Sequence, residues 1–215
     1  TIGIDIYQYT FKSAPNNIFS SLEGYTDGWK SPHEAGKFWY RFFPKTHQYV
    51  DGNDIDEKKI QMLSKTVNRI ENKYRKPIIF KNTTNSLRLR IINKIFPKAL
   101  IIWIKRDPLD VAISILRCRI QNHGDKNKWW AIEPPNIKEI KRLSFDEQIS
   151  QQIYQTEKVI RKEITLFPNK QILIINYKNL CSDINSELQK IEKFIKSNDI
   201  KIDKRENSIL PDLSV

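Results

Sequence analysis

Three predicted strands in this chain end in polar residues that could bind or transfer an anionic group. The ends are Lys81-Asn82, Lys105-Arg106-Asp107 and Asn176-Tyr177. In open parallel sheets, ligands bind beyond the carboxyl ends of the strands, where loops and helix starts converge. The first two ends place a cation before a predicted helix, whose N–H groups and dipole favour an anion. The pattern therefore predicts an anion-binding site around Lys81 and Arg106.

Apolar runs and helical periodicities predict the elements that must position these residues. Residues 77–80, 99–104 and 171–177 are typical of strands. The run 99–104 is apolar without alternation, as expected for a central strand buried on both faces of a parallel sheet. Helices are predicted after Asp54, over 87–95, from Asp107-Pro108, from the capping box Ser144-x-x-Glu147 to Pro168, and after Asp183. Strands that alternate with helices predict an α/β domain with a mostly parallel sheet.

The chain of 215 residues is long enough to bury one continuous core, and we expect a single domain over residues 1–215. Residues 1–53 are rich in aromatic, Pro, Ser and Asn residues without a sustained period, so they are expected to form a loop-rich segment. Residues 54–196 carry the predicted α/β core. Residues 197–215 form a basic, polar tail.

Composition narrows the class of protein and its partners. There are 37 Lys+Arg against 25 Asp+Glu, a formal net charge of +12, which favours anionic partners. No apolar run approaches the roughly 18 residues of a membrane span, and no signal sequence opens the chain, so a cytoplasmic protein without a membrane span is expected. Cys118 and Cys181 lack nearby Cys or His partners, so no metal site is predicted. The six glycines are scattered and form no phosphate-binding loop.

The stretch from Phe96 to Ser114 resembles a motif of the sulfotransferases that use 3′-phosphoadenylyl sulfate (PAPS). Its strand, its Arg106-Asp107-Pro108-x-Asp110 and its helical Ser114 are similar to the 3′-phosphate motif of that family, especially the branch with bacterial and glycan- or tyrosine-modifying members. Two further segments occur in the right order. Residues 77–82 look like the strand whose Lys reaches the transferred group, and residues 177–180 look like the family's Y-E-D-L segment.

The resemblance covers roughly residues 77–196 and implies a P-loop-NTPase-like three-layer sandwich, with a mostly parallel central sheet flanked by helices. It implies PAPS as the donor, adenosine 3′,5′-bisphosphate (PAP) as the product, and no metal. Arg106 and Ser114 would hold the 3′-phosphate, and Lys81 and Tyr177 would complete the nucleotide site. The alternatives are a solvated Arg106 before a capped helix and a Ser114 that faces solvent or bonds to a backbone carbonyl.

Sulfuryl transfer requires a cation near the bridging oxygen and a base for the acceptor hydroxyl. Lys81 suits the first role. In the resembling branch a Glu before the Lys-bearing strand is the base, so Glu34 is the first candidate and His33 the second. The alternative is that Ser31-Pro32 starts a helix in which Glu34 only complements the dipole. His47 lies in a K-T-H sequence like that of cytosolic members, but its placement before Arg106 does not fit, so we interpret it as a coincidence.

The family's 5′-phosphosulfate loop, of the type R-S-G-T-T, is absent from this sequence. We therefore expect an N-terminally incomplete chain, and a chain that is inactive as given if the loop is truly missing. The predicted function is sulfuryl transfer to an acceptor hydroxyl, of a carbohydrate or another small metabolite, with residues 1–53 on the acceptor side and without a nucleic-acid partner.

Two other functions remain open on the sequence. The charge of +12 is compatible with a basic nucleic-acid-binding module, although the cations are spread along the chain among 25 acids. A P-loop nucleoside or sugar kinase would share the α/β architecture, and a G-K-[ST] sequence upstream of Thr1 would favour it.

Overall fold

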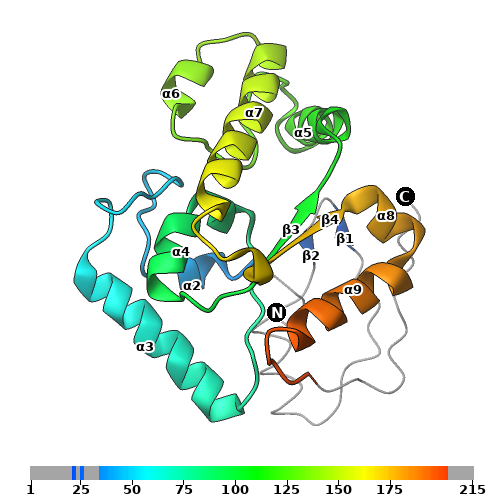
Figure 1. Cartoon of the computed structure of the whole chain (residues 1–215). Helices are drawn as coiled ribbons and strands as arrows, with labels where there is room; N and C mark the ends of the chain where they lie inside the picture. Colours follow the sequence, from blue (N-terminus) through cyan, green and yellow to red (C-terminus); the bar gives the residue numbers. More distant parts are fainter. Residues whose placement is uncertain (1–20, 23–24, 27–33, 203–215) are drawn as a thin grey trace.

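The computed structural model describes residues 21–22, 25–26 and 34–202, and its elements are mainly helices with a few short strands between them (Figure 1). The strands are β1 (Ser21–Leu22), β2 (Tyr25–Thr26), β3 (Ile101–Lys105) and β4 (Ile172–Asn176). The helices are α2 (Gly36–Trp39), α3 (Glu57–Tyr74), α4 (Leu89–Ile95), α5 (Pro108–His123), α6 (Ile137–Ile140), α7 (Phe145–Ile164), α8 (Tyr177–Ser182) and α9 (Ile184–Lys196). Short 3-10 helices are η1 (Thr83–Leu87) and η2 (Asn169–Gln171).

The helix starts follow the local chemistry of their caps. The Asp107 side chain accepts from the N–H of Leu109, and Asp183 caps α9 by accepting from Ser186 N–H. Ser144 and Glu147 form the predicted capping box of α7. The predicted helix after Asp54 begins later than that residue, because Asp56 is the cap of α3. These caps set the residue at which each helix begins.

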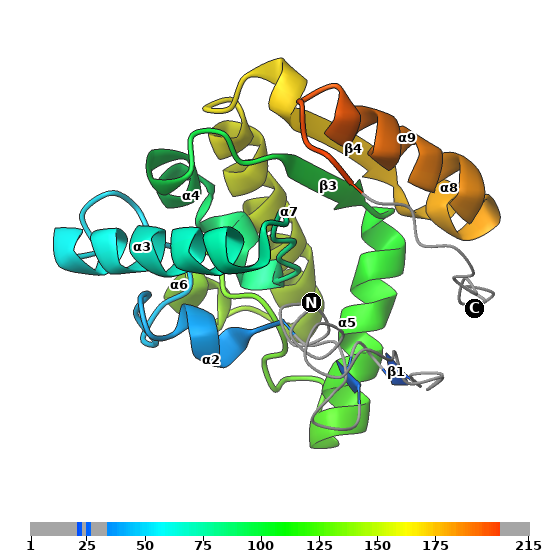
Figure 2. The ribbon, with the colours of Figure 1, turned by 90° about the horizontal axis from the view of Figure 1, so that it is seen from below.

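The described part of the chain contains one parallel strand pair, β3 and β4, so the mixed α/β class is confirmed. The register runs from Ile101 opposite Ile172 to Lys105 opposite Asn176, so the two strands end level with each other. In Figures 1 and 2, α7 and α9 lie on opposite sides of this pair. Strands β1 and β2 form a separate antiparallel pair. The predicted sheet of three strands is thus reduced to two parallel strands in the described residues.

The prediction that 99–104 is buried on both faces is wrong. Strand β3 begins at Ile101, and its side chains alternate between partly covered and exposed. Ile101 and Trp103 pack against a cluster that contains Ile160 and Ile164 of α7. On the opposite face Ile102 is 38% exposed and Ile104 is 49% exposed. Helix α7 therefore covers one face of β3, and the apolar run does not require cover on the other.

The prediction of a strand over 77–80 is also wrong. These residues form irregular chain, and no strand in the described part of the molecule pairs with them. Their apolar character has a different cause. Ile78 and Phe80 pack against a core cluster, and the Phe80 ring lies 4.8 Å from that of Trp39 and 5.7 Å from that of Phe38. The run anchors the chain on α2 through aromatic packing instead of strand pairing.

The core cluster that contains Trp39 is the larger of the two described core clusters and joins α2, α3, the segment between them and α4. Its buried members are Ala35, Trp39, Phe42, Phe43, Val50, Ile55, Ile60, Leu63, Val67 and Ile91. Part of the aromatic segment before residue 54 is therefore core and not only surface loop.

No helix in the described ranges is both long enough and apolar enough to cross a membrane.

Candidate active site

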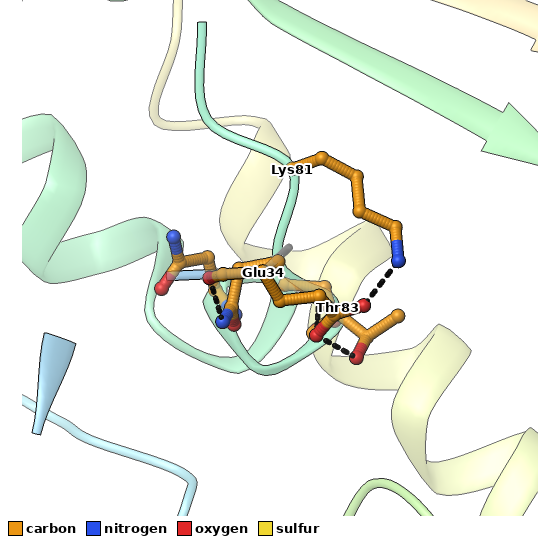
Figure 3. A network of polar contacts seen from close by, with 6 residues as sticks. Glu34, Lys81 and Thr83 are labelled. Atoms are coloured by element: carbon orange, nitrogen blue, oxygen red, sulfur yellow. Dashed lines mark hydrogen bonds and ion pairs between the residues drawn. The ribbon is translucent and has the colours of Figure 1, made fainter. Parts of the chain in front are cut away.

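Glu34 and Lys81, which lie far apart in the sequence, form an ion pair in the structure (Figure 3). The Lys81 ammonium donates to Oε1 of the Glu34 carboxylate. The other oxygen, Oε2, accepts from the Thr83 hydroxyl at 3.2 Å and from the Thr83 N–H at 3.4 Å. The Lys81 side chain is 63% exposed and that of Glu34 is 34% exposed, so both remain accessible to a ligand.

Asn82 joins the two segments that carry this cluster. Its Nδ2 donates to the Glu34 carbonyl oxygen at 2.8 Å, and its Oδ1 accepts from the N–H of Asn85 at 3.2 Å, which caps η1. The Phe80 ring packs on α2, which begins two residues after Glu34. The aromatic anchor and the Asn82 bonds together hold residues 81–83 against the start of α2.

A second pair of predicted site residues meets at the end of the parallel strands. Because Lys105 lies opposite Asn176, the residues that follow them, Arg106 and Tyr177, leave the sheet at the same edge. The Arg106 guanidinium lies over the Tyr177 ring at 5.0 Å from its centroid. A hydrogen bond with Cys181 and partial burial raise the pKa of Tyr177, against the opposing effect of Arg106, so the phenol stays neutral at physiological pH.

The start of α5 offers an anion fewer free N–H groups than its sequence indicates. Pro108 is the first helical residue and has no N–H, and the N–H of Leu109 already donates to Asp107 at 2.8 Å. The helix start is therefore largely satisfied by its own cap. Binding of an anion here has to depend mainly on side chains, of which Arg106 is exposed and Ser114, farther along α5, is half-buried.

The structure thus assembles the predicted residues in two groups. Glu34 contacts Lys81, and Arg106 contacts Tyr177. Ser114 lies on α5, whose cap follows Arg106 directly. His33 lies outside the described residues, and His47 is an exposed residue with Nε2 at 3.7 Å from an Asp54 oxygen. Within the described ranges, no group of three or more His, Cys, Asp or Glu residues could hold a metal ion.

A family model described as the sulfotransferase family matches residues 15–199 of the chain. The matched range includes both groups of candidate residues and all of β3, β4 and the helices between them. The chain belongs to the sulfotransferase family. Neither the curated proteins nor the solved structures gave a match to this chain. Membership in the family supports sulfuryl transfer as the general activity.

Two residues next to Lys81 bond to Glu34 although the sequence does not predict these contacts. Asn82 was predicted only as a polar residue at the end of a strand, and Thr83 was not among the predicted site residues of this sulfotransferase. The signal was present in part, because Asn before a short helical segment is a typical cap. The contact with Glu34 was not foreseeable, since it joins segments that are 48 and 49 residues apart.

Proposed function

We propose that this sulfotransferase transfers a sulfuryl group from PAPS to an acceptor hydroxyl, of a carbohydrate or another small metabolite. The observation that carries the proposal is the contact between Glu34 and Lys81. It places a carboxylate and a cation, the two groups that the reaction needs, within one accessible cluster. The proposal includes the P-loop-like architecture that the family resemblance implies.

The residues at the end of β3 and β4 suit an anionic nucleotide. Arg106 is exposed and is oriented by the face of Tyr177, and its guanidinium can donate two parallel hydrogen bonds to a phosphate. The Ser114 hydroxyl would supply a further donor from α5. Because Asp107 satisfies the first N–H of that helix, the assigned phosphate ligands in our proposal are the side chains of Arg106 and Ser114.

When bound, PAPS supplies a sulfur that moves from the bridging phosphate oxygen to the acceptor oxygen, and PAP leaves. The acceptor hydroxyl loses its proton to the Glu34 carboxylate in the same reaction. The Lys81 ammonium balances the negative charge that develops on the bridging oxygen. Lys81 has a flexible four-carbon stem and an exposed side chain, so it can turn from Glu34 toward that oxygen.

The binding half of this proposal is tested by calorimetry of the full-length protein with PAP. We expect Arg106→Ala to weaken PAP binding at least tenfold, in line with the loss of a charge-assisted hydrogen bond. Arg142→Ala, which changes another exposed arginine, is the matched control and should leave the affinity unchanged. Equal affinity for PAP and for adenosine 5′-phosphate, or no loss in Arg106→Ala, would contradict the assigned phosphate site.

The chemical half is tested by the transfer of labelled sulfate from PAPS to glucose as a simple hydroxyl acceptor. We expect Glu34→Gln and Lys81→Met to lower kcat by about a hundredfold or more, with PAP affinity changed much less in Glu34→Gln. Lys76→Met, at an exposed position five residues earlier in the chain, is the control for loss of one positive charge. Full activity of Glu34→Gln would exclude Glu34 as the base.

A further inference from the structure

The two oxygens of the Glu34 carboxylate have different hydrogen-bond partners, and this difference indicates different roles. Oε1 accepts only the Lys81 ammonium among the hydrogen bonds of the described residues. Oε2 accepts two bonds from one residue, the hydroxyl and the N–H of Thr83. The Lys81 ammonium lies at the end of a flexible, exposed side chain, whereas the Thr83 donors belong to a short side chain and to the backbone of η1. Oε2 is therefore held in place, whereas the hydrogen-bond partner of Oε1 can be exchanged for another.

We propose that Thr83 is a positioning residue that holds the Glu34 carboxylate through Oε2, so that Oε1 faces the acceptor hydroxyl. This inference rests on the proposed function, in which Glu34 is the base. When Lys81 turns toward the bridging oxygen, Oε1 loses its partner and takes the proton of the acceptor hydroxyl. Thr83 keeps its two bonds to Oε2 through this step, so the carboxylate does not rotate away.

The surroundings of Thr83 support a positioning role over simple capping. Asn82 already caps η1 by accepting from Asn85, so the helix start has its own side-chain cap without Glu34. Asn82 also fixes the Glu34 backbone, through its bond to the carbonyl oxygen. Backbone and carboxylate of Glu34 are thus held by two consecutive residues, and the Thr83 hydroxyl can be removed without removing the Asn82 cap of η1.

The test compares Thr83→Val, which removes the hydroxyl at nearly constant shape, with Thr83→Ser, which keeps it. Thr84→Val, the same change one residue later in η1, is the matched control. With PAPS and glucose, we expect Thr83→Val to lower kcat about tenfold, as one charge-assisted hydrogen bond to the carboxylate is lost. The KM for PAPS should not change, and Thr83→Ser should restore kcat.

A second measurement does not depend on catalysis. The carboxyl carbon of Glu34, observed by carbon-13 NMR in the protein without ligand, should shift in Thr83→Val and keep its position in Thr83→Ser and Thr84→Val. An unchanged resonance in Thr83→Val, or a Thr83→Ser enzyme as slow as Thr83→Val, would overturn the positioning role. Failure of the proposed function looks different, because Glu34→Gln would then remain fully active whatever the Thr83 variants do.

Discussion

Arg106 and Arg119 lie near the two ends of α5, and the chain uses their charges in opposite ways. Arg106 precedes the cap of the helix, is exposed and contacts one aromatic ring, that of Tyr177. Arg119 lies in the last part of the helix and is fully buried, at 0% exposure. Its Nη1 donates to the Lys126 carbonyl at 3.1 Å and to Gln148 Oε1 at 2.9 Å.

The partners of Arg119 explain how a buried cation is tolerated although no carboxylate of the described residues pairs with it. Neutral carbonyl and amide oxygens solvate its guanidinium, and its charge lies 5.2 Å from the centre of the Trp129 ring. Burial nevertheless lowers the pKa of Arg119, because the charged form is less well solvated than in water. Positive charge alone therefore does not mark a ligand site in this protein. Solvent access and the identity of the existing partners separate a binding cation from a structural one.

Removing the buried cation should have the largest effect on stability. Arg119→Ala leaves a cavity and removes the donor of the buried Gln148 Oε1 and of the Lys126 carbonyl oxygen, so we expect unfolding to become easier by about 2–4 kcal/mol. Arg117→Ala changes an exposed arginine two residues earlier on the same helix and should stay within about 0.5 kcal/mol of the parent. Urea unfolding followed by circular dichroism measures both. Equal stability of the two variants would show that the buried bonds of Arg119 contribute nothing net.

The strand ends and helix caps were predictable because each rests on local chemistry. Asp107-Pro108 and Ser144-x-x-Glu147 carry their own hydrogen bonds, so their positions are encoded within a few residues. The strand predicted over 77–80 failed for the opposite reason. An apolar run satisfies strand pairing and aromatic packing equally well, and only the tertiary position of α2 decided between them.

In the candidate site, too, the local features were predictable and the tertiary contacts were not. Lys81 and Arg106 were predicted from their places after apolar runs, and Tyr177 follows Asn176 at the edge where β3 also ends. Thr83 was not predicted as a partner of Glu34, because the contact is set by how residues 81–83 lie against the start of α2. The burial of Arg119 depends on Gln148 and Gln152 of α7, which no local pattern links to it.

Arg88 is a second buried arginine, and we expect its substitution to have an intermediate effect on stability. It is 1% exposed, its guanidinium lies 4.4 Å from the centre of the Phe43 ring, and its Nε donates to the Gln48 carbonyl at 3.3 Å. Burial lowers the pKa of Arg88 to about 10. Arg88→Lys keeps the charge but loses the planar contact with Phe43, so we expect a loss of about 1–2 kcal/mol in urea unfolding.

The control for Arg88→Lys is Arg69→Lys, the same change on the exposed side of α3. It should alter the free energy of unfolding by less than about 0.5 kcal/mol. If both variants lose the same small amount of unfolding free energy, the aromatic contact of Arg88 does not distinguish it from a surface arginine. The difference between buried and exposed arginines would then hold for Arg119 alone.

The smallest expected effect concerns the aromatic partner of Arg106. The raised pKa of Tyr177 comes first from its hydrogen bond with Cys181 and next from burial, so the folded state holds the phenolic proton more tightly than the unfolded chain. A group with a raised folded pKa contributes its stability fully below the unfolded value of about 10 and loses it as the pH rises through the folded value.

Tyr177→Phe should therefore be less stable than the parent by up to about 1 kcal/mol at pH near 8, and this difference should shrink at pH near 11. Urea midpoints of both proteins at the two pH values measure it. Tyr154→Phe, which removes a phenol that is 58% exposed, should show a much smaller pH dependence. A Tyr177→Phe difference that stays constant between the two pH values would mean that folding does not protect this proton. Arg106 would then lie over a phenol that ionises as readily as one in water, and the hydrogen bond with Cys181 would not hold the phenolic proton of Tyr177.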